Sequence, residues 1–254
     1  MNKIALITPV FNPTEKQIEN LVSSYTSLKK IINCFYLAVN NDSKNIEILK
    51  EKTRNFNCVV NIEEDAGPDD ALRKIVDHVS EDFVWMLTCG ELVELKDNDF
   101  QNKIKKDNIV FGNTTFINQN GKYSNMNPEK FNRFYKYKIP ILNLSSCIMS
   151  KENFIKSSPT KKYKVATDYE QILRLYSLDI SLIHTNSFKL FFFNDGNSIR
   201  NRVTGFAEMY HISKYFYPKN NMQRILIYFL LILKHRINPI KFFKELSKVD
   251  DYIV

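Results

Sequence analysis

The sequence predicts an α/β fold with a mainly parallel central sheet and helices on both of its faces. Over the first 90 residues, four short apolar runs alternate with three helical segments, the order typical of β-α-β units joined by right-handed crossovers. The chain has 254 residues, 44% hydrophobic and 25% charged, which fits one domain of the larger α/β kind, with or without an appendage. It has only 6 glycines and no glycine-rich phosphate-loop motif, which argues against nucleotide-binding folds built on such loops.

The predicted elements of the first half follow from apolar spacing. Apolar runs bounded by a breaker or a polar turn predict strands at 3–9, 34–39, 58–62 and 83–87. Helical spacing and helix-start signals predict helices at 14–32, 46–54 and 69–79. Thr14 and Gln17 have the spacing of a capping box. Pro68 and the two aspartates after it suit a helix start, where the helix dipole favours them.

The second half predicts an α+β region laid on the α/β core. Antiparallel strands are expected at 108–116 and 122–125, around a turn at 118–121. A further strand (145–149), a helix from Lys151, a helix (166–178) and a strand-rich segment (181–194) follow. We therefore expect one domain at 1–200 and a helical, basic and apolar segment at 201–254.

Carboxylates gather where the predicted parallel strands end. The strand ends lie at 8–12, 40–43, 63–67 and 88–91, and three of the four carry acidic residues. In such sheets ligands bind beyond the carboxyl ends of the strands. Residues 63–99 hold twelve acidic and three basic residues, which is typical of a metal site or of a solvated helix face.

Five segments resemble, in order and at the usual spacing, those of inverting glycosyltransferases of family 2 with the GT-A fold, of the type that builds lipopolysaccharide and capsule. The similarity covers about residues 3–178. The segments are TPVFN (8–12), LAVNNDSKNIEILK (37–50), EEDAGPDDALRKI (63–75), FVWMLTCGELVE (83–94) and KYKVATDYEQILRL (162–175).

The resemblance implies transfer of a sugar from a nucleotide-diphosphate sugar, UDP-sugar being the first choice, to a hydroxyl of a glycan or lipid-linked glycan, with inversion. It implies that Asp168 is the general base and that Glu91 holds Mn²⁺ or Mg²⁺, because carboxylate oxygens suit these ions and the leaving diphosphate needs neutralising. The nucleotide-sugar-binding residues it implies are Thr8, Pro9, Phe11, Asn12, Asn40, Asp42, Asp65 and Asp70.

Two departures from the family pattern leave a second interpretation open. The metal motif, normally Ser-Asp-Asp or similar, reads Cys89-Gly90-Glu91, and Asn40 stands where an aspartate is usual. A catalytically degenerate GT-A protein that binds a glycan or a partner without turnover would show such changes.

Several of the implied site residues also have plainer interpretations. Asp168 suits a helix N-cap, with Glu170 as the other candidate base. Asp65 and Asp70 suit a helix start, and Glu91 suits a surface position after a strand.

Basic and aromatic residues alternate in KFNRFYKYK at 130–138. This pattern suits nucleic acid, but an α/β core with an acidic edge argues against a nucleic-acid partner. The resemblance instead places Lys136 or Lys138 near the donor phosphates.

The C-terminal segment contains nine consecutive apolar residues, 225–233, followed by a basic stretch. A membrane-crossing helix needs about 20 residues, whereas an apolar and basic helix suits a membrane surface. Packing on the core or against a second protomer in a homodimer is the alternative. The start lacks the pattern of a signal peptide, and none of the four cysteines form a CxxC pair. We therefore expect a cytoplasmic protein with reduced thiols, peripheral on the inner face of the cytoplasmic membrane.

Overall fold

The computed structural model describes residues 2–118, 121, 123–125, 142–160, 162–178, 180–194, 201–219 and 221–251. The chain divides into two compact units. The first comprises Met1–Pro128, Leu142–Ser158 and Asp179–Asn194, and the second comprises Glu129–Ile141, Pro159–Leu178 and Asp195–Val254. These boundaries differ from the predicted 1–200 and 201–254. The reason is that Tyr169 and Leu173, from the segment before residue 178, share one hydrophobic cluster with Phe206 and Ile212.

The first unit is built on one sheet, which has nine strands among the described residues. Its parallel part holds β1 (Ile4–Val10), β2 (Cys34–Asn40), β3 (Cys58–Glu63) and β4 (Phe83–Met86) in the order β3-β2-β1-β4. The sheet continues through β8 (Cys147–Ser150), β6 (Asn108–Asn118), β9 (Ser181–Asn194) and β5 (Leu92–Leu95), with β7 (Tyr123–Asn125) paired to β6. Antiparallel pairing begins between β4 and β8. The predicted α/β class is confirmed.

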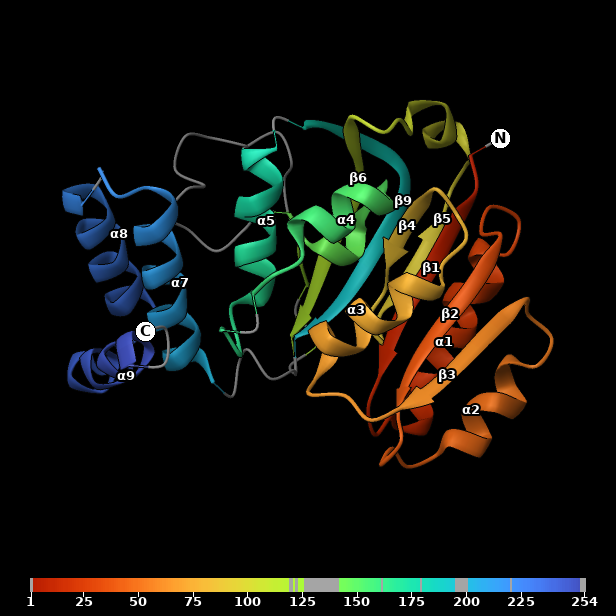
Figure 1. Cartoon of the computed structure of the whole chain (residues 1–254), viewed down its shortest axis with the longest axis horizontal. Helices are drawn as coiled ribbons and strands as arrows, with labels where there is room; N and C mark the ends of the chain where they lie inside the picture. The colour runs from red at the N-terminus through yellow and green to blue at the C-terminus, as the bar shows by residue number, and fades with distance from the viewer. Residues whose placement is uncertain are drawn as a thin grey trace. The chain divides into compact units, whose positions relative to one another are not determined.

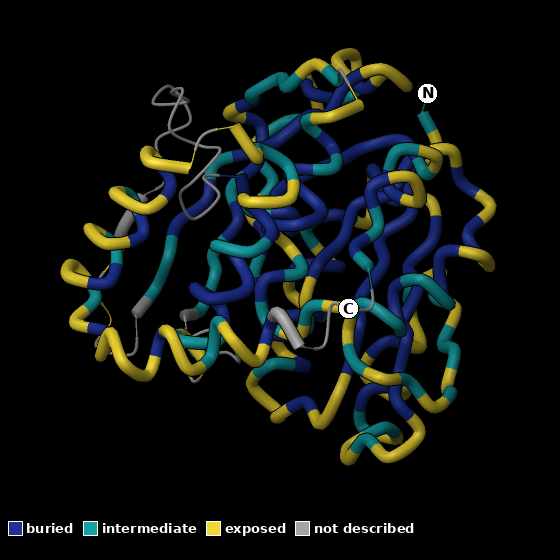
Figure 2. Tube along the Cα trace, turned by 60° about the vertical axis from the view of Figure 1, so that its left-hand side comes forward, coloured by how far each residue is buried: buried dark blue, intermediate teal, exposed yellow. Residues whose placement is uncertain are grey.

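Helices cover both faces of this sheet. Helices α1 (Glu15–Leu28) and α2 (Ile46–Thr53) contact each other, and α3 (Pro68–His78) contacts α4 (Lys151–Ser157). In Figure 1, α3 and α4 lie in front of the sheet and α1 lies behind it. Because both faces are covered, β1 and β2 are buried along their whole length (Figure 2), as expected for parallel strands.

The residues around Thr14 correctly predicted where the first helix begins. The Thr14 hydroxyl accepts a hydrogen bond from the Gln17 N–H at 3.3 Å, and the Thr14 N–H donates to Gln17 Oε1 at 2.8 Å. The predicted capping box is therefore confirmed. The predicted antiparallel hairpin is also confirmed by the pairing of β6 with β7.

Three elements of the first unit were not predicted: strand β5 and the 3₁₀ helices η1 (Asp99–Lys103) and η4 (Leu144–Ser146), the last of which overlaps the strand predicted at 145–149. β5 has four residues and pairs antiparallel with β9, Leu92 opposite Phe191. The short sequence of β5 carries no clear strand pattern of its own. Its extended conformation depends on pairing with the distant strand β9.

The second unit, as far as it is described, is helical. It contains α5 (Thr167–Ser177), α7 (Arg202–Phe216), α8 (Asn221–Lys234) and α9 (Pro239–Asp251). One cluster of buried apolar residues, including Tyr169, Phe206, Tyr228 and Phe242, joins the four helices. None of the helices in the described part of the chain has the length and apolar character needed to cross a membrane.

Candidate functional site

The first unit presents three neighbouring loops at the carboxyl ends of β1, β2 and β3. The register pairs Val10 with Val39 and Asn40 with Glu63, so these strands end side by side. β1 is flanked by β2 on one side and by β4 on the other. The direction of the strand order changes at β1, which is where open α/β sheets bind their ligands.

The loop after β1 is tied to the loop after β2. Asn12 Oδ1 accepts the Lys44 N–H at 2.9 Å, and the Asn12 N–H donates to Ser43 Oγ at 3.3 Å. Asn12 has a φ of 45°, a left-handed conformation that asparagine tolerates better than most residues. Thr8 and Pro9 are buried within β1, whereas the Phe11 side chain is 65% exposed. Of the four residues predicted to line a base pocket, Phe11 and Asn12 therefore lie at the surface.

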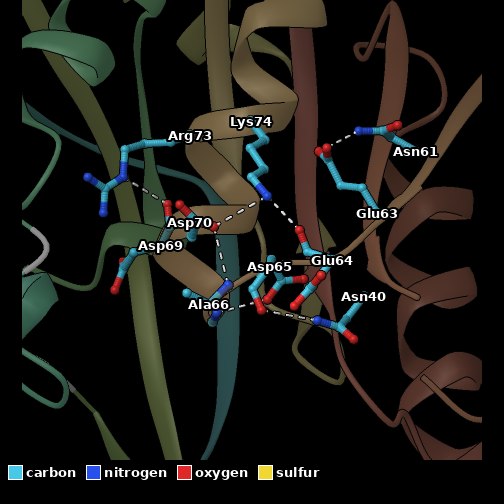
Figure 3. Close-up of polar contacts among 11 residues, drawn as sticks. Asn40, Asn61, Glu63, Glu64, Asp65, Ala66, Asp69, Asp70, Arg73 and Lys74 are labelled. Carbon is cyan, nitrogen blue, oxygen red and sulfur yellow. Dashed lines mark hydrogen bonds and ion pairs between the residues drawn. The ribbon is translucent and has the colours of Figure 1, made fainter. Parts of the chain in front are cut away.

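Asn40 connects the loops after β2 and β3. Its side chain is buried; Oδ1 accepts the Asp42 N–H at 2.9 Å and Nδ2 donates to the Asp65 carbonyl at 3.3 Å (Figure 3). An aspartate at this position has acceptors only and cannot donate the second hydrogen bond. The asparagine side chain therefore makes a contact with the loop after β3 that an aspartate could not make. Asp42 itself is exposed.

Asp65 and Asp70 both bind backbone at the start of α3. Asp65 Oδ1 accepts the Gly67 N–H at 2.8 Å, and Asp70 Oδ2 accepts the Ala66 N–H at 3.2 Å (Figure 3). Asp70 also forms an ion pair with Lys74 at 3.5 Å. These contacts agree with the helix-start interpretation, and the donor role of the two aspartates stays a prediction.

Glu91 closes the turn that follows β4. Its side chain is 4% exposed, and Oε2 accepts the Thr88 N–H at 2.7 Å. The Glu91 N–H donates to the Thr88 carbonyl at 3.1 Å, and the Glu91 carbonyl accepts from Ser24 Oγ at 3.2 Å. The carboxylate thus stabilises a turn anchored to α1.

The described residues do not form a complete metal site on their own. Nowhere in the described part of the chain do three His, Cys, Asp or Glu side chains gather so as to hold a metal ion. Burial, followed by the charge of Glu91, raises the pKa of the neighbouring Cys89 to about 12. Cys89 therefore stays a thiol at neutral pH. The metal role of Glu91 stays a prediction.

Gly90 is required by its conformation and by its neighbours. It has a φ of 103°, and a Cβ atom there would lie 2.8 Å from Cγ of Gln17. Its carbonyl accepts a hydrogen bond from Asn20 Nδ2 at 2.9 Å. A side chain at this position would therefore be strained and would crowd Gln17 of α1.

Replacing Gly90 by alanine is therefore expected to destabilise the protein. The strained backbone costs about 1–3 kcal/mol, and displacing Gln17 from its capping position adds to that cost. Thermal or urea unfolding measures the change. Gly121→Ala is the control, because Gly121 also has a positive φ, 69°, but an added Cβ would meet nothing within 4 Å. Equal losses in the two variants would show that crowding against Gln17 is unimportant.

Asp168 belongs to the second unit, on α5. The helix begins at Thr167 and its N-cap is Ala166, so the N-cap interpretation of Asp168 is wrong. Asp168 is exposed, in the first turn. Glu170, the other candidate base, is 2% exposed; Oε2 accepts the Thr160 N–H at 3.0 Å and Oε1 pairs with Arg174 at 2.8 Å. Asp168 is thus exposed to solvent whereas Glu170 is buried, and the role of Asp168 as general base stays a prediction.

Glu208 of α7 holds the segment that leads into α5, and the sequence analysis missed it. The residue is fully buried. Oε1 accepts the Lys164 N–H at 3.0 Å, and Oε2 accepts the Val165 and Ala166 N–H groups, both at 2.8 Å. The available signal was an acid placed between two apolar residues of a predicted helical segment.

The predicted diphosphate contacts Lys136 and Lys138, with the basic-aromatic segment 130–138, lie outside the described residues.

Comparisons with known proteins identify the fold. No protein-family model matches the chain, and no curated protein matches it. The crystal structure of S. aureus TarS is similar with a TM-score of 0.55 and 14% identity, over 86% of this chain and 43% of that chain. TarS 1–349 in complex with UDP gives 0.55 and 15%, over 84% and 65% of the two chains. The same segment in complex with UDP-GlcNAc gives 0.60 and 16%, over 84% and 66%.

The chain thus spans less than two thirds of the length of each of these structures. At this level of identity the similarity concerns the fold. The chain has the mixed α/β architecture of the GT-A fold, as the sequence predicts.

Proposed function

We propose that this protein transfers a sugar from a UDP-sugar to a hydroxyl of a glycan or lipid-linked glycan, with inversion. The observation that carries the proposal is the similarity of its fold to TarS in complex with UDP-GlcNAc. The five sequence segments that resemble family 2 enzymes of surface-polysaccharide synthesis support the same activity independently.

The donor is proposed to bind at the edge formed by the loops after β1, β2 and β3. Phe11 presents an exposed ring there, and an aromatic ring can stack on a uracil base. Asp42 is exposed in the adjoining loop and can accept hydrogen bonds from the nucleoside. The hydrogen bonds of Asn12 and Asn40 hold these loops in place before the donor arrives, which reduces the entropy lost on binding.

Asp168 is proposed as the general base. Its carboxylate would take the proton of the acceptor hydroxyl while the hydroxyl oxygen attacks the anomeric carbon. A new carbon–oxygen bond forms on one face of the sugar, the bond to the nucleoside diphosphate breaks on the other, and the configuration inverts. The exposure of Asp168 to solvent supports this choice, since the acceptor must reach the base, whereas Glu170 is buried.

A donor screen by thermal unfolding tests the proposal. We expect a UDP-sugar, rather than a GDP-, dTDP- or CMP-sugar, to raise the melting temperature, because a ligand at 100 times its Kd stabilises the native state by about 2.7 kcal/mol. Phe11→Ala should lower the affinity for every uridine donor; Tyr123→Ala, at another exposed aromatic residue, is the control. A stabilising shift by all four nucleotides, or by none, would contradict the predicted donor.

The same screen with and without Mn²⁺ tests the metal role of Glu91. Glu91→Gln keeps an acceptor for the Thr88 N–H but removes the charge. A donor shift that Mn²⁺ strengthens in the parent and not in Glu91→Gln would support the metal role. A shift indifferent to Mn²⁺ would leave Glu91 as a residue of the turn alone.

A degenerate protein that binds without turnover is the second candidate. It is favoured by one observation: Asn40 and Glu91, at two positions where the family contacts its donor, are buried and bonded within the protein. Binding of a UDP-sugar without transfer to any glycan or lipid-linked acceptor would favour it over the enzyme.

A further inference from the structure

One face of α8 is exposed and entirely apolar. Six of its side chains are between 47% and 80% exposed: Met222, Ile225, Leu226, Phe229, Leu230 and Leu233. At 100° per residue these positions fall within an arc of about 140° on the helix. Monomeric proteins rarely leave a continuous apolar stripe of this kind open to water.

The orientation of α8 is fixed from its other side. Arg224, Tyr228 and Ile232 are buried there, at 1%, 1% and 6% exposure. Arg224 donates to the carbonyls of Ser213 and Tyr217, at 3.3 and 2.9 Å, near the end of α7. Rotating the helix to hide the apolar stripe would therefore expose the buried residues and break these hydrogen bonds.

The exposed surface of α9 combines apolar and basic residues. Ile240 is 80% exposed and Phe243 is 64% exposed. Lys241, Lys244 and Lys248 are exposed on the same helix. Lys219 before α8, Lys234 at the end of α8 and Arg236 between the two helices are also exposed. Between residues 219 and 249 the only acidic residue is Glu245, which pairs with Lys248 at 2.7 Å.

We propose that the exposed faces of α8 and α9 bind the surface of an anionic membrane. Their apolar residues suit the boundary between headgroups and acyl chains, and their lysines suit anionic lipid headgroups. A second copy of this chain would bring like charges together, so charge favours lipid over self-association. α8 has 14 residues and is about 21 Å long, and one of its sides is buried against the protein. In this proposal it therefore lies along the membrane surface. The inference is independent of the donor chemistry.

Vesicle flotation with the full chain tests this inference. We expect binding to vesicles of phosphatidylcholine with 30 mol% phosphatidylglycerol, about tenfold weaker binding to phosphatidylcholine alone, and loss on adding 0.5 M salt. The double variant Leu226→Ser, Phe229→Ser should lose at least about tenfold in binding. Its matched control is Tyr123→Ser, Ile155→Ser, which removes two apolar side chains of similar exposure from the first unit.

Charge reversal separates the contribution of the lysines to vesicle binding from that of the apolar side chains. Lys241→Glu, Lys244→Glu should reduce binding to the anionic vesicles, whereas Lys29→Glu, Lys30→Glu, at two exposed positions of the first unit, should not. Circular dichroism and thermal unfolding establish that each variant is folded. Equal binding by the α8 variant and its control would overturn the proposal. A second result would also overturn it: the parent forms a dimer in sedimentation velocity and does not bind vesicles, and the α8 variant is monomeric. The apolar face would then bind a second copy of the chain.

Discussion

Replacing Asp168 by asparagine is expected to lower the rate of sugar transfer by about 100- to 10,000-fold, the usual contribution of a general base. Asparagine keeps the size of the side chain but cannot take the acceptor proton. Binding of UDP should be unchanged, because the proposed donor residues lie on the loops after β1, β2 and β3. Radiolabelled transfer and calorimetric UDP titration measure the two quantities separately.

The control for this substitution is Glu51→Gln, at an exposed acid of α2, which should keep full activity. Full activity of Asp168→Asn would remove the residue from the mechanism. Loss of activity together with loss of UDP binding would instead indicate a damaged fold.

Replacing Glu208 by alanine is expected to have the largest effect on stability. The change removes one carboxylate that accepts three backbone N–H groups, from Lys164, Val165 and Ala166. An unsatisfied buried donor costs about 1–3 kcal/mol; the Ala166 bond is buried and the other two are partly buried, so we expect a total loss of about 3 kcal/mol. At about 2–4 °C per kcal/mol for a chain of this size, the melting temperature should fall by roughly 6–12 °C.

Two variants make this test specific. Glu208→Gln keeps one acceptor oxygen and should lose less stability than Glu208→Ala. Glu245→Ala removes an acid of the same unit that is partly exposed and pairs with Lys248, and an ion pair of this kind contributes about 0–1 kcal/mol. If Glu208→Ala were no worse than Glu245→Ala, the buried carboxylate would not be what holds the segment before α5.

The predicted elements that the structure confirms have strong local signals. The capping box at Thr14 and Gln17, the helix-start residues at Pro68 and the apolar runs of β1 and β2 act within one element, and so can be read from sequence alone. β5, η1 and η4 were not predicted from the sequence. The conformation of β5 is set by pairing with β9, which is far away in the chain.

The sequence by itself determined the order of the strands and helices from β1 to β4, the α/β class and the resemblance to family 2 glycosyltransferases. Only the tertiary structure shows which neighbours the residues at the departures from that pattern contact. Asn40 donates a hydrogen bond to the carbonyl of Asp65, and the turn at Gly90 lies against Gln17. The carboxylates of Glu91 and Glu208 bind backbone N–H groups. Local spacing indicates which residues belong to one helix or strand, whereas the partners of a buried polar group come from other segments and exist only once the chain has folded.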